Sequence, residues 1–177
     1  MKKRKGKVKD GLVEVFYDNG QLEYRGNWKH VQTGLWERFY PNGQLESREN
    51  YRDGHLNGLV EMFYENGQLR MRINHTDGKE NGLWEEFYEN GQLESRENFK
   101  DGEQNGLREL FHENGQLRIR ENYIDGWENG LYERFDSNGQ LQFRGNYIDG
   151  ELDGLVVLSD EDGNLTRTDT YRNGDLI

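Results

Sequence analysis

Short runs rich in aromatic and aliphatic residues recur along the whole chain, and two dipeptides punctuate them. The first, Asn-Gly, lies between the two runs of a pair, and the second, Asp-Gly, leads from most pairs to the next. Asn-Gly between two such runs is the strongest local signal for a β-hairpin, because both residues tolerate positive φ angles. The pattern therefore predicts a series of hairpins with strands of about five to seven residues.

The hairpins are copies of one unit. Gly-Leu recurs at a spacing of 23 residues and then of 24 residues five times, and Asn-Gly-Gln-Leu follows each of the first six copies at a constant offset. A fixed period of this length is typical of repeat architectures, in which each unit buries its apolar face only against its neighbours. The sequence thus predicts an all-β fold, an elongated single-layer antiparallel meander of about seven repeated β-hairpins.

The repeats divide the chain into two regions. Residues 1–10 form a basic N-terminal arm, and residues 11–177 hold the seven tandem repeats as one domain. In the last copy, Ser159 and Asp160 stand where the earlier copies have Phe and, in most of them, Tyr. We expect this degenerate copy to cap the array and to make its edge hard to extend.

Comparison of the copies separates the columns of the repeat into kinds. An apolar kind is almost invariant, with a Leu in every copy, beginning at Leu12, and a Phe in the first six, beginning at Phe16. We expect these side chains to stack along the array and to form its core. A charged kind has Glu on the first strand and Arg on the second, and we expect it to be a solvated or cross-paired ladder.

The register of the hairpin decides how the charged columns meet. A two-residue Asn-Gly turn sets Glu37 and Arg48 directly opposite each other on one face, where they could pair. Pro41 favours instead a three-residue turn with a Gly bulge, because Pro would cost the two-residue turn a ladder hydrogen bond. That register would place Leu45 opposite Phe39 and would move the Arg to the other face from the Glu. Both registers are open on sequence grounds.

A third kind of column varies from copy to copy and holds Trp, Tyr, Met and Arg, which are enriched at protein interfaces. The alternative is that these residues fill the weaker face of a thin sheet. Trp127 lies in a turn column that is otherwise mostly charged, so we expect its side chain to be exposed. It would either bind a partner or pack on the neighbouring loop. The candidate partner-binding residues are Trp36, Met62, Met71, Trp84, Ile119, Trp127, Tyr132 and Phe143.

Composition agrees with a β-sheet and limits the chemistry. The chain has no Ala but 23 Gly, which argues against helices, and an aromatic content of 12% argues against disorder. The lack of Cys excludes disulfides, thiolate zinc sites and cysteine nucleophiles. No catalytic motif breaks the period, and one Asp in each Asp-Gly turn falls short of the oxygen ligands that calcium needs. We expect no enzyme activity, no catalytic residue, no metal and no cofactor.

Charge is unevenly distributed. Six of the 23 Lys and Arg residues lie in residues 1–9, so the rest of the chain carries 17 bases against 34 acids, a net charge of −17. Such a body repels nucleic acid and anionic lipid and favours basic partners. The sequence has no apolar run of 18 residues, and no apolar stretch of a secretory signal follows the basic start. We expect a cytoplasmic protein, or a mature chain whose leader was removed, and no membrane attachment.

Phe-Tyr-x-Asn-Gly-Gln-Leu followed by Asn-Tyr-x-Asp-Gly-x-x-Asn-Gly-Leu resembles the MORN-variant repeat, which occurs in tandem in many bacterial proteins. The resemblance covers nearly the whole chain after Asp10. It implies an elongated, twisted antiparallel sheet and an antitoxin-like role, in which a protein binds and neutralises a partner. Related eukaryotic MORN arrays are linked to membranes and to protein assembly. This chain departs from them in its acidic body and in having Asn-Tyr where they have Gly followed by Trp or Phe.

The sequence therefore predicts a non-catalytic scaffold that binds another protein, one with a basic surface, through one face of the sheet. It would neutralise that partner as an antitoxin, immunity protein or inhibitor does. An acidic nucleic-acid mimic is one alternative, against which the regular Arg column counts. A peripheral membrane or assembly module that uses residues 1–9 is another, and the oligomeric state is open.

Overall fold

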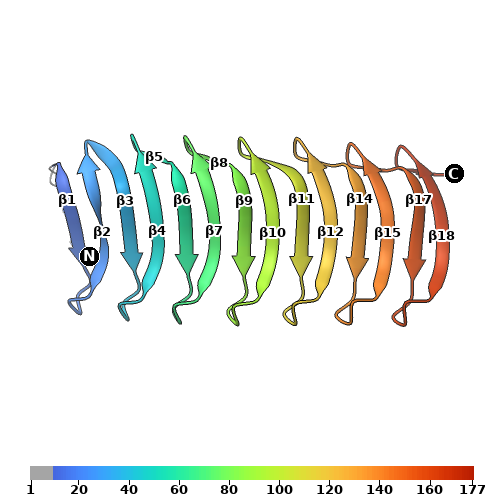
Figure 1. Ribbon diagram of the computed structural model, residues 1–177, viewed down its shortest axis with the longest axis horizontal. Coiled ribbons are helices and arrows are strands. Elements are labelled where there is room, and N and C mark those ends of the chain that lie inside the picture. Colours follow the sequence, from blue (N-terminus) through green and yellow to red (C-terminus); the bar gives the residue numbers. More distant parts are fainter. Residues whose placement is uncertain (1–9) are drawn as a thin grey trace. The chain divides into compact units, whose positions relative to one another are not determined.

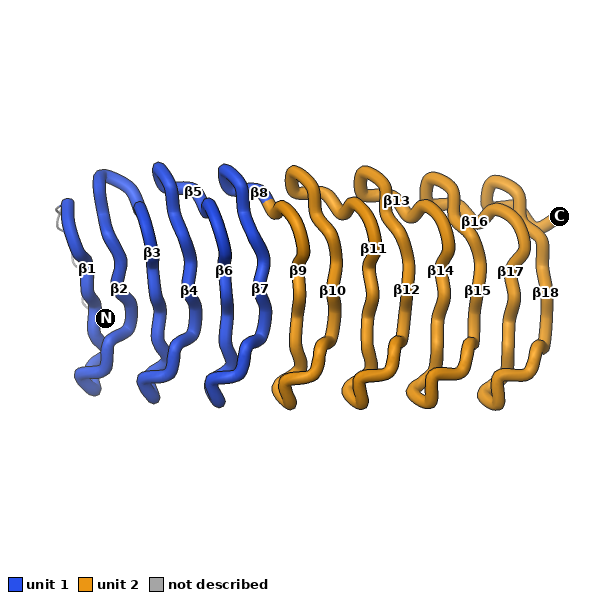
Figure 2. The backbone as a smooth tube through the Cα atoms, viewed as in Figure 1, with its two compact units in different colours: residues 1–79 blue, residues 80–177 orange. Residues whose placement is uncertain are grey.

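A computed structural model describes residues 10–177 of the protein, and these residues form strands and turns but no helix (Figure 1). The chain divides into two compact units, unit 1 with residues 1–79 and unit 2 with residues 80–177 (Figure 2). The basic arm predicted for residues 1–10 lies, except for Asp10, outside the described residues.

Unit 1 is an antiparallel meander of hairpins. Each long strand pairs with the next one in sequence, and a short strand lies beside β4. β8 (Lys79–Glu80) spans the point in the sequence at which the units divide. The other strands are β1 (Gly11–Phe16), β2 (Leu22–Lys29), β3 (Val31–Phe39), β4 (Leu45–Arg52), β5 (His55–Leu56), β6 (Gly58–Phe63) and β7 (Leu69–Thr76).

Unit 2 repeats the same arrangement, with hairpins that follow one another along the sheet. Its strands are β9 (Gly82–Phe87), β10 (Leu93–Lys100), β11 (Glu103–Phe111), β12 (Leu117–Ile124), β13 (Trp127–Glu128), β14 (Gly130–Phe135), β15 (Leu141–Ile148), β16 (Glu151–Leu152), β17 (Gly154–Ser159), β18 (Leu165–Arg172) and β19 (Asp175–Leu176). The predicted all-β meander of repeated hairpins is therefore confirmed in each unit.

The Asn-Gly turn has the three-residue, bulged form that Pro41 favours. The backbone N–H of Tyr40 donates to the carbonyl of Gln44 at 2.8 Å, and the N–H of Gly43 donates to the carbonyl of Tyr40 at 2.8 Å. Gly43 has a φ of 87°, a conformation that costs Gly little. The turn places Leu45 opposite Phe39, as this register predicts.

A second irregularity follows at once on the returning strand. β4 carries an extra residue at Glu46, so that Arg38 lies opposite Ser47 and Glu37 opposite Arg48. The expectation that a bulged turn separates the charged columns is wrong, because the second bulge reverses the alternation that the first one set. Every described hairpin has this second shift.

The register sorts the columns onto two faces of the strands, because successive side chains point to opposite sides. The ladder face carries the invariant apolar and the charged columns, which in the β3–β4 hairpin are Leu35, Glu37, Phe39, Leu45 and Arg48. The variable face carries the columns that differ between copies, which in the same hairpin are Trp36, Arg38, Ser47, Glu49 and Tyr51.

The buried apolar core lies on the variable face. Within residues 10–177 its buried members all belong to variable columns, and they are Val60, Met71, Ile73, Leu110 and Val156. Six of the seven Leu residues of the invariant column are exposed, for example Leu59 with 37% of its surface exposed. The expectation that the Leu column forms the core is wrong, because Glu and Arg occupy the middle of the ladder face and leave Leu at its margin. The Phe column is partly covered by Arg, as where the Arg25 guanidinium lies 5.7 Å from the Phe39 ring centroid.

Polar side chains join successive copies at both edges. At the Asn-Gly edge, the Tyr40 hydroxyl donates to the carbonyl of Phe63 at 2.7 Å. At the Asp-Gly edge, Asn105 Nδ2 donates to Asp125 Oδ1 at 2.9 Å, across to the turn of the next copy. These bonds explain the recurring Tyr, Asn and Asp as parts of the scaffold.

Candidate binding site

The candidate residues predicted from the sequence lie in two settings. Trp127 lies at the Asp-Gly edge and is 63% exposed, and its ring packs beside Gly150, where an added Cβ would come within 3.2 Å. Met71 is buried, so its side chain serves packing. The residues found on the variable face of their own unit are Trp36, Met62, Met71, Trp84, Ile119, Tyr132 and Phe143. Their binding of a partner stays a prediction.

A hollow on the variable face of unit 1 gathers four aromatic rings, and we call it the aromatic pocket. Its volume is about 320 Å³, and its aromatic lining consists of Tyr24, Trp28, Trp36 and Tyr51. Trp36 lies at the centre, nearly parallel to Tyr24, with 6.1 Å between centroids and 28° between planes. Trp28 and Tyr51 meet Trp36 edge-on, at 74° and 73°. The volume suits a small ligand or a large side chain.

Gly26 allows Trp36 to lie against the sheet. The two residues are opposite each other on β2 and β3, and a Cβ on Gly26 would come within 2.2 Å of the indole ring. The indole Nε1–H donates to the carbonyl of Asn27 at 3.1 Å, which fixes the ring further. A Gly in a strand often marks such a close approach, and here it makes room for the pocket.

Glu49 and Tyr51 form the polar side of the pocket. Glu49 Oε1 accepts from the Ser47 hydroxyl at 3.0 Å, and Glu49 Oε2 accepts from the Tyr51 hydroxyl at 2.7 Å. Burial and the hydrogen bond to Glu49 raise the pKa of Tyr51 well above its ordinary value, so the phenol stays a donor at neutral pH. The Arg38 guanidinium lies 5.9 Å from the Tyr24 ring centroid.

Sequence reasoning named only Trp36 among the residues at the centre of this pocket. Trp28 and Tyr51 were missed because their column is aromatic in almost every copy and looks structural, and Glu49 was missed because an acidic residue on a strand looks like solvated charge. The signal that could have found them is Gly26, which stands where the next four copies have Glu or Ile. Gly26 lies between Tyr24 and Trp28 in the sequence.

In unit 2 the same columns hold an ionic cluster in place of a hollow. Arg108 occupies the column of Trp36, and its Nε lies 3.2 Å from Glu97 Oε1 while its Nη1 lies 2.5 Å from Glu121 Oε1. Burial alone would lower the pKa of Arg108, but the hydrogen bonds and charges of Glu121 and Glu97 raise it. Burial, reinforced by the charge of Glu121, raises the pKa of Tyr123 to about 12.

A second hollow, which lies in unit 2, is larger and more open than the aromatic pocket of unit 1. It has a volume of about 620 Å³ and is bordered by His112, Arg118, Arg134 and Asp136 among others. Asp136 is held by its own turn, because its Oδ1 accepts from the backbone N–H of Gln140 at 2.9 Å, and this bond lowers the pKa of the carboxyl. The charges on this surface are therefore mixed.

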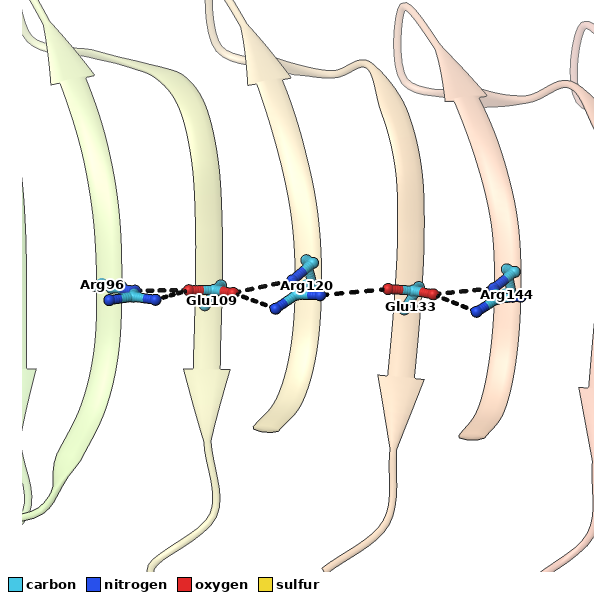
Figure 3. A network of polar contacts seen from close by, with 5 residues as sticks. All are labelled: Arg96, Glu109, Arg120, Glu133 and Arg144. Carbon is cyan, nitrogen blue, oxygen red and sulfur yellow. Dashed lines mark hydrogen bonds and ion pairs between the residues drawn. The ribbon is translucent and has the colours of Figure 1, made fainter. Parts of the chain in front are cut away.

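On the ladder face, Glu and Arg form chains of ion pairs that run across the strands (Figure 3). Glu109 Oε2 lies 2.6 Å from Arg96 Nη2, and Glu109 Oε1 lies 2.8 Å from Arg120 Nη2. Glu133 continues the chain to Arg144 at 2.7 Å. The predicted cross-paired ladder is confirmed. Arg48 contacts Glu37 and Glu61, and Arg120 contacts Glu109 and Glu133, so each of these two Arg residues joins the Glu of two successive copies.

The ladder keeps Glu109 ionised although this side chain is buried. Only 2% of the Glu109 side chain is exposed. Burial by itself raises the pKa of Glu109, but the hydrogen bonds and charges of Arg120 and Arg96 outweigh it and hold the pKa below its ordinary value. The acids of this face are thus neutralised by Arg.

Neither a metal cluster nor a transmembrane helix is found within residues 10–177. Those residues contain no group of three or more His, Asp or Glu side chains that could hold a metal ion. They also contain no helix long and apolar enough to cross a membrane.

The comparisons with known proteins agree with the repeat geometry. The MORN repeat variant matches six successive segments, which are residues 9–30, 32–53, 56–77, 80–101, 104–125 and 128–149. A search of the curated proteins finds no match. Since the six segments cover most of the chain and coincide with its hairpins, this protein belongs to the MORN repeat variant family.

Proposed function

We propose that the protein is a non-catalytic scaffold that binds another protein through its variable face, with the aromatic pocket of unit 1 as the main contact. Membership in the MORN family makes the chain a repeat scaffold or interaction module. The observation that carries the finer proposal is the contrast between the two faces. The ladder face is nearly the same in every copy, whereas the variable face differs and is hollowed at the aromatic pocket.

The pocket is not needed to fill the sheet. In the β6–β7 hairpin the same columns hold Val60 and Ile73 opposite each other, and both are buried. Where β2 of the first copy pairs with β3 of the second copy, these columns hold Gly26 and Trp36, which lie opposite each other and leave a cavity beside them. Large aromatic residues at a hollow are the usual anchors of protein interfaces, because they bury much apolar area at low conformational cost.

Charge indicates the kind of partner. The chain outside residues 1–9 carries 34 acids and 17 bases, so a basic surface would be attracted to it at long range. A scaffold that covers a basic protein could neutralise it, as the antitoxin-like role implied by the repeat resemblance requires. An acidic nucleic-acid mimic is less well supported, because the acids of the ladder face alternate with Arg.

The test is affinity capture from the source organism with the whole chain as bait and with two variants of β3. Trp36→Ala removes the centre of the pocket, while Leu35→Ala removes a 43% exposed side chain of the ladder face next to it. We expect a stoichiometric protein to be retained by the native chain and by Leu35→Ala, and Trp36→Ala to weaken its binding at least about tenfold. Equal retention by both variants would refute the assignment of the face.

A further inference from the structure

Three rings of the aromatic pocket are arranged as a floor with walls. Trp36 lies over Gly26 and forms the floor, and Trp28 and Tyr51 stand at 74° and 73° to it. Ring faces carry the negative part of the aromatic quadrupole, so several rings around one cavity attract a cation, and Trp does so best. The geometry therefore favours a positively charged occupant over a neutral one.

The protein itself shows that a ring of this pocket accepts a guanidinium. The Arg38 side chain lies with its central carbon 5.9 Å from the Tyr24 centroid, within the range of a cation–π contact. Arg38 is exposed, lies opposite Ser47 across the strands and is itself part of the lining at the rim of the pocket. The rings of Trp28, Trp36 and Tyr51 line the cavity itself.

Glu49 supplies the anion for such a cation. Ser47 and Tyr51 each donate to one of its oxygens and so hold the carboxylate in place. A carboxylate oxygen accepts more than one hydrogen bond, and both oxygens can therefore also accept from an incoming N–H group.

Unit 2 contains a similar arrangement in which the protein itself supplies the cation, the guanidinium of Arg108. Glu97 and Glu121 occupy the column of Glu49, and Arg108 lies between them in the column of Trp36. Gln104, in the column of Gln32, donates its Nε2–H to Glu97 at 2.5 Å. In unit 1 the column has the carboxylate but Trp36 in place of the Arg, and a cavity lies beside it.

We infer that the aromatic pocket is a receptor for one cationic side chain, that of Arg or Lys, from a basic segment of the partner protein. This inference rests on the proposed function and deepens it, because it names the group that the partner contributes. The cation would lie against Trp36 and donate to Glu49, as Arg108 donates to Glu121 within unit 2.

The experiment uses the whole chain and capped tripeptides, so that it does not depend on the unidentified partner. Acetyl-Gly-Arg-Gly-amide and acetyl-Gly-Lys-Gly-amide are titrated against ¹⁵N-labelled protein, with the Gln and Phe peptides as neutral controls. The four Trp indole N–H signals are assigned with Trp→Phe variants. We expect the cationic peptides to shift the signals of Trp28 and Trp36 saturably, with a Kd on the order of millimolar, and to leave Trp127 unmoved. Equal binding of the Phe peptide would overturn the inference.

Two substitutions in the pocket, one that removes a negative charge and one that removes a positive charge, should change the affinity in opposite directions. Glu49→Gln should weaken the cationic peptides at least about tenfold, since charge-assisted hydrogen bonds are about twice as strong as neutral ones. Glu103→Gln makes the same charge change at the exposed first residue of β11 in unit 2 and should leave the Kd within about twofold. Arg38→Gln should tighten binding, because it removes a resident positive charge from the rim. Weaker binding of the cationic peptides by Arg38→Gln would contradict the expected charge repulsion and refute the inference. The dispersion of the indole signals reports whether each variant is folded.

The outcomes separate this inference from the proposed function. If a captured partner depends on Trp36 but the cationic peptides leave the indole signals unchanged, the cation receptor is refuted and the scaffold stands. If the peptides bind as expected but Trp36→Ala retains every captured protein, the proposed function is refuted while the chemistry of the pocket stands.

Discussion

Replacement of Glu109 by Gln tests the ion-pair ladder at its most buried member. Glu109 accepts from Arg96 Nε at 2.6 Å and from Arg120 Nε at 2.9 Å, and each Arg adds a second contact through Nη2. Gln has nearly the same shape but no charge, and its amide group turns N–H donors toward one of the two guanidinium groups. The change therefore leaves the packing intact and removes the charge at the centre of the chain of ion pairs.

The expected loss of free energy of unfolding depends on how deeply the Glu109 carboxylate and its Arg partners are buried. Removing one partner of a fully buried ion pair costs about 3–5 kcal/mol. Arg96 and Arg120, however, are 46% and 45% exposed, so water hydrates them when the carboxylate is gone. We therefore expect the free energy of unfolding to fall by about 2 kcal/mol, between the buried value and the value of about 0–1 kcal/mol for surface pairs. With a urea slope of about 2 kcal/mol per molar, the midpoint would fall by about 1 M.

The pH dependence of this loss identifies its electrostatic origin. The pKa of Glu109 is lowered in the folded protein, so its contribution is fully present above the ordinary Glu pKa of about 4.3 and is lost as the pH falls through the lower, folded value. Urea unfolding followed by circular dichroism should thus show the full difference between Glu109→Gln and the native chain at pH 7 and a smaller one below about pH 4. Glu103→Gln, the exposed control, should stay within about 0.5 kcal/mol of the native chain. A difference that is the same at pH 3 and pH 7 would refute the reasoning.

Other substitutions test the core and the repeat contacts, all by urea unfolding. Ile73→Ala should cost about 2–4 kcal/mol because Ile73 is fully buried, while Leu59→Ala in the same hairpin should cost less than about 1 kcal/mol; the opposite order would return the core to the Leu column. Gly26→Ala should cost about 1–3 kcal/mol and change the Trp fluorescence, because the new methyl group meets the Trp36 ring. Tyr88→Phe removes a 2.7 Å hydrogen bond to the next copy and should cost about 1 kcal/mol, and no loss would assign this Tyr a role other than the bond.

The hairpins and their turn could be predicted because their signals are local. Asn-Gly between apolar runs indicates the hairpin, and Pro41 favours the three-residue form because it has no N–H to donate to the ladder. The sequence left both registers open, and the backbone hydrogen bonds of the turn decide for the bulged one. The seven copies confirm each other, so chance matches to these short signals are averaged out. The Glu and Arg columns also predict their own pairing, because they carry opposite charges.

The second bulge could not be predicted, because the residue that forms it carries no signal. Its column holds Glu46 in the second copy but Arg70 and Gln142 in later ones, and none of these residues is specific for a bulge. Without this bulge the faces cannot be assigned, since one residue of slippage moves every later side chain to the other face. The core was misplaced for a related reason: a constant Leu shows that the environment repeats, not that it is buried.

The division of the sheet into two faces explains how a repeat can carry a specific site. The Glu–Arg chain satisfies its own charges, and the Tyr and Asn side chains join successive copies at the edges, so these contacts repeat without involving the side chains of the variable face. Copies are then free to fill that face with apolar residues or with a buried ion cluster around Arg108. Gly26 weakens β2, as Gly145 in the same column weakens β15, since Gly loses most entropy in a strand; of the two, only Gly26 lies where the added methyl group of an Ala would meet a Trp ring. A Gly inside a strand and an open aromatic cavity beside it both lower the stability of the fold. Sequence choices that lower stability are expected at functional sites, and this is why the binding site is assigned here.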